Sequence, residues 1–77
     1  MDSFTDRDIA SEHLKLAEKH IVEGQKRVDA QLMLLAKLER HGHNIEEAEK
    51  LLRVFEQLLA LHIKHRNRIA QELKAGL

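Results

Sequence analysis

Residues 10–38, which read ASEHLKLAEKHIVEGQKRVDAQLMLLAKL, repeat an apolar pattern every seven residues. The first series of this repeat consists of Leu14, Ile21, Val28 and Leu35. The second series, offset from the first by three residues, consists of Ala10, Ala17, Gly24, Gln31 and Leu38. Two positions in each heptad form one stripe along an α-helix. Because the repeat lasts for four heptads, the segment predicts one long amphipathic helix.

The second half of the chain carries another apolar stripe. At the helical spacing of 3.6 residues, its members share one face between residues 48 and 73. They are Ala48, Leu51, Leu52, Phe55, Leu58, Leu59, Ile63, Ile69, Ala70 and Leu73. This shared face predicts a second long helix in this half of the chain.

Few residues can interrupt a helix here, because the chain contains no proline and only three glycines. Thr5 can cap the start of the first helix. Gly42 follows the cations Arg40 and His41, which is typical of a helix end. Asn44 can then cap the start of the next helix. The predicted elements are a helix over about residues 6–41, a turn at about 41–44 and a helix over about 45–75.

So short a turn makes the two helices antiparallel. The predicted fold class is therefore all-α, an antiparallel two-helix hairpin with a coiled-coil pattern of packing. A chain of 77 residues is too short for two hydrophobic cores, so the hairpin is expected to be a single domain over residues 1–77. A tight turn centred near residue 43 would place His20 opposite Arg66, and His62 opposite Gly24.

A two-helix hairpin has one line of contact between its helices, the seam, but no interior. Proteins this small that lack a disulfide or a structural metal usually oligomerise, and the chain contains no cysteine. We therefore predict a homodimer that forms a four-helix bundle. The predicted oligomer interface comprises Leu32, Leu34, Leu35, Leu51, Val54, Phe55, Leu58 and Leu61. The alternative is a monomer whose apolar patch binds another protein.

Six histidines are unusual in so short a chain. On a helical wheel, His62 and Arg66 fall within the apolar face of the second helix, and His20 lies near the edge of the first. We predict that these three form a buried polar layer, because a polar position in a helical core selects one alignment of the helices. This interpretation requires no cofactor. The alternative is a metal- or pH-responsive bundle in which His20, His62 and His65 bind a transition metal.

Basic residues concentrate near the end of the second helix. The cluster consists of Lys64, Arg66, Arg68 and Lys74. It can complement the negative end of the helix dipole, or it can form a small patch for anions or nucleic acid. Lys and Arg together number 13, the same as Asp and Glu, and the chain has no Trp or Tyr to stack on bases. These counts argue against nucleic acid, although a small nucleic-acid accessory protein stays an alternative.

Motifs of catalysis and targeting are missing from the chain. It has neither a glycine-rich phosphate loop nor a Ser/His/Asp set, so we expect no enzymatic activity. Its start, MDSFTD, lacks the regions of a signal peptide, and its most apolar window, residues 51–63, is too short and charged to span a bilayer. We therefore expect a cytoplasmic interaction, scaffold or regulatory module that binds itself and does not contact a membrane.

Four segments of the chain have a distinctive order of residues. They are residues 20–27 (HIVEGQKR), 38–44 (LERHGHN), 48–52 (AEKLL) and 61–66 (LHIKHR). Together they resemble a group of short, uncharacterised bacterial helical-hairpin proteins of unknown function. The resemblance covers nearly the whole chain and implies a small cytoplasmic bacterial helical protein. It implies no activity, because none is established for the group.

Overall fold

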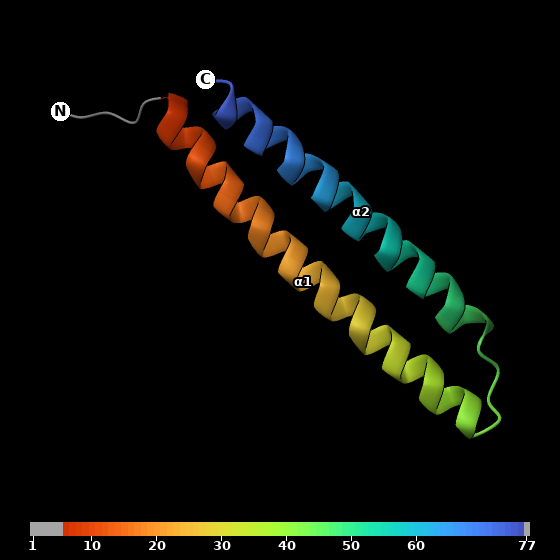
Figure 1. Cartoon of the computed structure of the whole chain (residues 1–77). Coiled ribbons are helices and arrows are strands. Elements are labelled where there is room, and N and C mark those ends of the chain that lie inside the picture. The colour runs from red at the N-terminus through yellow and green to blue at the C-terminus, as the bar shows by residue number, and fades with distance from the viewer. Residues whose placement is uncertain (1–5, 77) are drawn as a thin grey trace.

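The computed structural model describes residues 6–76, and their side chains from residue 8 onward. It consists of two α-helices, α1 (Asp6–Arg40) and α2 (Glu46–Lys74), joined by a short loop. The helices run antiparallel, so that the start of α1 and the end of α2 lie together and the loop lies at the other end (Figure 1). The described residues contain no strand, which confirms the all-α hairpin. Both helices lie within one residue of their predicted bounds.

Gly42 ends α1 through its backbone conformation. Its φ of +70° lies in the left-handed region, which residues with a β-carbon rarely adopt. The N–H of His43 donates a hydrogen bond to the carbonyl of Leu38 at 2.9 Å. The N–H of Gly42 donates to the carbonyl of Glu39 at 3.1 Å. Because these bonds satisfy carbonyls that a helix end leaves free, the predicted stop at Gly42 is confirmed.

The side chain of Asn44 makes a hydrogen bond to the backbone at the start of α2. Its Oδ1 accepts a hydrogen bond from the backbone N–H of Glu46 at 2.9 Å. The carbonyl of Ile45 accepts one from the N–H of Glu49 at 2.8 Å. Asn44 thus satisfies one of the free N–H groups at the helix start. The N-cap itself is Ile45 and not Asn44 as predicted, because the regular helix begins at Glu46. Thr5, which was predicted to cap α1, lies outside the described residues.

The core of the hairpin is a thin line of side chains along the seam. The buried apolar residues of the described chain are Ala10, Ala17, Val28, Leu35 and Ile69. On α2 the seam follows alternating spacings of four and three residues and contains Ala48, Leu52, Phe55, Leu59, His62, Arg66, Ile69 and Leu73. No large side chain in the described part is fully buried. One hairpin therefore has a seam without an enclosed interior.

The alignment of the two helices differs from the predicted one. The ring of His20 lies 5.2 Å from the ring of His62, centroid to centroid, and not opposite Arg66. Gly24 faces Leu59 rather than His62, because a β-carbon on Gly24 would lie 3.3 Å from Leu59 Cδ1. Compared with the predicted pairs, both contacts show that α2 is displaced along α1 by about one helical turn. The predicted pairing assumed that the chain reverses symmetrically around residue 43, and this assumption was wrong: the loop leads back from the end of α1, and α2 starts short of that end (Figure 1).

Replacing Gly42 by alanine tests the conformation that ends α1. A β-carbon at this position meets nothing within 4 Å, so its effect comes only from the left-handed backbone. We expect Gly42→Ala to lower the free energy of unfolding by about 1 kcal/mol, measured by urea denaturation at a fixed protein concentration. Gly42→Asn is the matched control and should lose less, because asparagine tolerates this region. Equal stability of Gly42→Ala and the parent would contradict the assignment.

Candidate interaction surface

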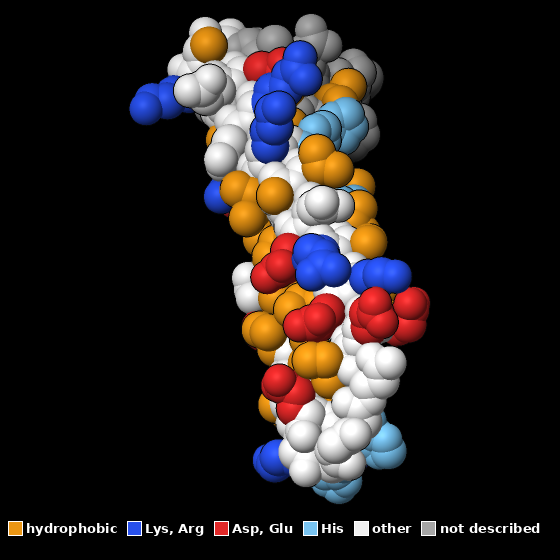
Figure 2. Space-filling view, turned by 90° about the vertical axis from the view of Figure 1, so that its right-hand side faces the viewer, with side chains coloured by type: hydrophobic (Ala, Val, Ile, Leu, Met, Phe, Trp, Pro, Cys, Tyr) orange, Lys and Arg blue, Asp and Glu red, His pale blue; other side chains and the backbone are white. Residues whose placement is uncertain are grey.

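A second apolar line runs along α2 outside the seam. It consists of Leu51, Val54, Leu58 and Leu61, which are 43%, 46%, 43% and 61% exposed. Their spacings of three, four and three residues are those of a single helix stripe. We call these four residues the outer stripe. Figure 2, which views the hairpin from the side of α2, shows hydrophobic side chains exposed along much of its length.

The outer stripe lies roughly 100° around α2 from the seam, at about 100° per residue. α2 thus presents two apolar lines, and α1 covers only one of them. In a four-helix bundle, each helix packs against two neighbours on adjacent faces. The outer stripe is therefore in the position where a further helix would pack.

The apolar surface continues from α2 onto α1. A surface pocket is lined by His13, Leu16, Ala17 and His20 of α1 and by His65 of α2. Since His65 follows Leu61 by one helical turn, the flank of α1 that carries Leu16 lies on the same side as the outer stripe. Leu34, five helical turns after Leu16, shares that flank. These two leucines, 51% and 44% exposed, form the interaction face together with the outer stripe.

The residues predicted for the oligomer interface lie in three different places in the structure: on the interaction face, on the opposite flank of α1 and in the seam. Leu34 and the outer stripe lie on the interaction face. Leu32 is 48% exposed, but it lies on the opposite flank of α1, because two residues along a helix correspond to a rotation of about 200°. Leu35 is buried and Phe55 is half-buried at a seam position. These last two residues belong to the core of a single hairpin, which corrects their assignment to an interface between copies.

Polar side chains interrupt the seam close to the middle of the hairpin, on the side toward the start of α1. His20 and His62 are half-buried, with their rings tilted by 49°. Arg66, one turn further along α2, is also half-buried. Its Nε is buried without a hydrogen-bond partner among the described residues. A buried donor without a partner is unfavourable, so this level contributes less to stability than an apolar layer would.

Within a single copy, the described histidines do not come together as a group of three metal ligands. Among the residues that the structure describes, no group of three or more His, Cys, Asp or Glu side chains could hold an ion. His20 and His62 lie in contact in the seam, and His65 lines the surface pocket next to His20. The metal site suggested for His20, His62 and His65 therefore has two imidazoles side by side, and the third imidazole does not join them to complete a set of ligands.

Gln31 is a seam residue whose role was not predicted. It is only 6% exposed, and its Nε2 donates a hydrogen bond to the carbonyl of Ala48 at 2.9 Å. This bond joins α1 to the first turn of α2 and favours one alignment, as a single polar residue does in a helical core. The signal was present in the sequence, because Gln31 is the one polar side chain in the second heptad series.

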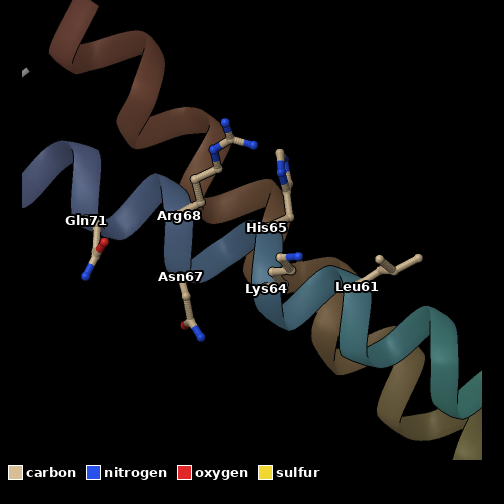
Figure 3. Close-up of a pocket in the computed structure, with 6 residues that line it drawn as sticks. All are labelled: Leu61, Lys64, His65, Asn67, Arg68 and Gln71. Atoms are coloured by element: carbon tan, nitrogen blue, oxygen red, sulfur yellow. The ribbon is translucent and has the colours of Figure 1, made fainter.

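The basic cluster near the end of α2 does not act as one unit. Arg66 turns into the seam, while the other three members are exposed. The pocket next to them is lined by Leu61, Lys64, His65, Asn67, Arg68 and Gln71 (Figure 3). In this view His65 and Arg68 extend to one side of α2, whereas Asn67 and Gln71 point to the other. Side chains that diverge in this way do not enclose an anion, so the geometry does not favour an anion site.

Neither helix of the described chain has a stretch long and apolar enough to cross a lipid bilayer. Comparison with known proteins finds no relative: no protein-family model, no curated protein and no solved structure matches the chain. The resemblance to short bacterial hairpin proteins therefore stays a prediction. The function has to be inferred from the interaction face.

Proposed function

We propose that the protein is a self-associating helical module, in which two copies pack through the interaction face to form a four-helix bundle. The observation that carries this proposal is the outer stripe. Its side chains repeat the spacing of a packed helix line while they are 43–61% exposed in a single hairpin. Burying a fully exposed side chain of this size is worth about 1.5–3 kcal/mol, and about half of that is still to be gained at each of the four positions. A second copy that covers the stripe therefore stabilises the protein.

The shape of a single hairpin also supports association. Its radius of gyration is 17.7 Å, whereas a compact chain of the same length would have about 11.5 Å. An extended pair of helices buries few side chains, and the described chain has five buried apolar residues. Small proteins with so little core usually gain stability from a partner.

The interaction face is large enough for a stable dimer. The hairpin is 21 Å wide, and the 29 residues of α2 extend over about 44 Å at 1.5 Å per residue. The product, which is the footprint of the whole flank, is roughly 900 Å² per copy, so a contact over most of the flank would reach the ~800 Å² that each partner buries in an interface of standard size. A second copy can therefore supply a contact of the required area.

In this proposal the bundle serves as a scaffold or regulatory module. Its interaction face is covered by the second copy, and the polar surfaces of both helices remain available to other molecules. The competing candidate is a monomer whose face binds a different protein. Oligomeric state separates the two candidates.

Sedimentation equilibrium of the purified chain tests the proposal. We expect a species of twice the 8.9 kDa chain mass at micromolar concentration, because the footprint of the face is that of a standard interface. An 8.9 kDa species throughout the micromolar range would overturn self-association. That result would favour a different protein as the occupant of the face.

A further inference from the structure

We infer that the two copies meet antiparallel along α2, around a two-fold axis at Leu58, with Glu47 of each copy beside Arg68 of the other. The inference rests on the proposed dimer and specifies its geometry. In a two-fold dimer both copies use the same surface, so each contact between two different positions occurs twice. Whether the two α2 helices run parallel or antiparallel therefore determines which residues at the ends of the outer stripe face each other.

The two ends of the outer stripe carry opposite charges. Continuing its spacing toward the loop leads to Glu47, four residues before Leu51. Continuing it toward the end of α2 leads to His65 and then to Arg68. Both end residues are exposed. The ion pair of Glu47 with Lys50, at 3.5 Å, is open to solvent and contributes little, so the Glu47 carboxylate is available for another contact.

The charges favour the antiparallel orientation. In a parallel pair Glu47 would face Glu47 and Arg68 would face Arg68, and both ends would repel. In an antiparallel pair each Glu47 faces an Arg68, so both ends attract and the orientation is selected. The midpoint between these two positions falls next to Leu58. Leu58 then meets its own copy, and Val54 of one copy packs against Leu61 of the other.

The position of this axis on α1 follows from the seam. Gly24 faces Leu59 across the seam. Because the helices are antiparallel, the level of Leu58, one residue earlier on α2, corresponds to Gln25, one residue later on α1. A two-fold axis through Leu58 thus passes the level of Gln25, and residues at equal distances on either side of Gln25 meet each other.

The exposed flank of α1 fits this axis, although it was not used to choose the axis. Leu16 and Leu34 lie nine residues on either side of Gln25, so each leucine packs against the other in the second copy. Glu23 and Arg27 lie two residues on either side and are exposed on the same flank. The rotation therefore places another pair of opposite charges side by side. Both helices support the same geometry.

Introduced cysteines test the geometry directly, because the chain has none of its own. Leu58→Cys, on the axis, is expected to crosslink to its own copy under mild oxidation. Glu47→Cys and Arg68→Cys are each expected to stay uncrosslinked alone and to crosslink after the two proteins are mixed. Val22→Cys is the control that stays uncrosslinked. Val22 is 54% exposed and lies about 120° around α1 from the interaction face.

The outcomes distinguish the geometry from the dimer itself. Crosslinking of Leu58→Cys and of the mixed pair alone supports the inference. A crosslink of Glu47→Cys to itself would show a parallel pair and overturn the inference, while self-association would stand. A Leu58→Cys crosslink with none at positions 47 and 68 would overturn the alignment. No crosslink at any position, together with a monomer in sedimentation, would overturn the proposed function.

Charge reversal provides a second readout without oxidation. Glu47→Arg and Arg68→Glu each place like charges at both ends of the dimer, and each is expected to raise the dissociation constant about tenfold. After mixing, the two variants place opposite charges at both ends, so a heterodimer with nearly the parent affinity is expected. A mixture as weak as either variant alone would contradict the contact between positions 47 and 68.

Discussion

Replacing Leu58 by aspartate is expected to convert the dimer into folded monomers and to raise its dissociation constant at least about a hundredfold. Leu58 is 43% exposed in a single hairpin and meets its own copy on the proposed axis. The substitution removes both leucines from the contact and places two carboxylates against each other in apolar surroundings. The loss should reach about 3 kcal/mol, since about 1.4 kcal/mol corresponds to a tenfold change in affinity.

Val22→Asp is the matched control for this variant. It places the same carboxylate on a 54% exposed apolar position of α1 that is not part of the interaction face. Its sedimentation should equal that of the parent. Circular dichroism should show unchanged helix content for both variants, because neither Leu58 nor Val22 lies in the seam. If Leu58→Asp sediments as a dimer of parent affinity, the contact between copies lies elsewhere.

Replacing Leu35 by alanine is expected to lower the free energy of unfolding by about 2–5 kcal/mol. Leu35 is 8% exposed and is one of the five buried apolar residues of the described chain. Two long helices cannot close the space left by its missing methyl groups without losing other contacts. Since a protein of this size has only a few kcal/mol of stability, helix content should fall at room temperature. Urea denaturation followed by circular dichroism measures the effect.

Leu32→Ala is the control for the core variant, because it makes the same chemical change three residues away on the same helix. Leu32 is 48% exposed and lies outside both the seam and the interaction face. Its loss should change the free energy of unfolding by less than about 1 kcal/mol. A larger loss of unfolding free energy for Leu32→Ala than for Leu35→Ala would mean that Leu32, and not Leu35, lies in the seam between the two helices.

The two substitutions separate the two apolar lines of the molecule. Leu58→Asp should abolish association while the hairpin keeps its helices. Leu35→Ala should unfold the hairpin although every residue of the interaction face is still present. This contrast is expected only if one line holds the helices of a chain together and the other holds the copies together.

The helices and their ends could be predicted from local signals. Heptad spacing marks a helix face whatever covers it, and the conformations of Gly42 and Asn44 depend on neighbours only a few residues away. The off-seam positions of Val54 and Leu61 could be predicted for the same reason, whereas Leu51 and Leu58 were expected on the face that meets the first helix and are exposed in the outer stripe. Leu35 and Phe55 were assigned to the wrong contact, because a helical wheel shows which side chains are apolar but not which apolar line meets the helix of the same chain.

The sequence by itself determined the two helices, the break between them and the apolar character of their faces, because all of these depend on residues close together in the chain. Only the tertiary structure decided how the helices align. Three contacts define this alignment: His20 with His62, Gly24 with Leu59, and Gln31 with the carbonyl of Ala48. A loop of this length permits more than one alignment of two long helices, and the fit of side chains across the seam selects among them.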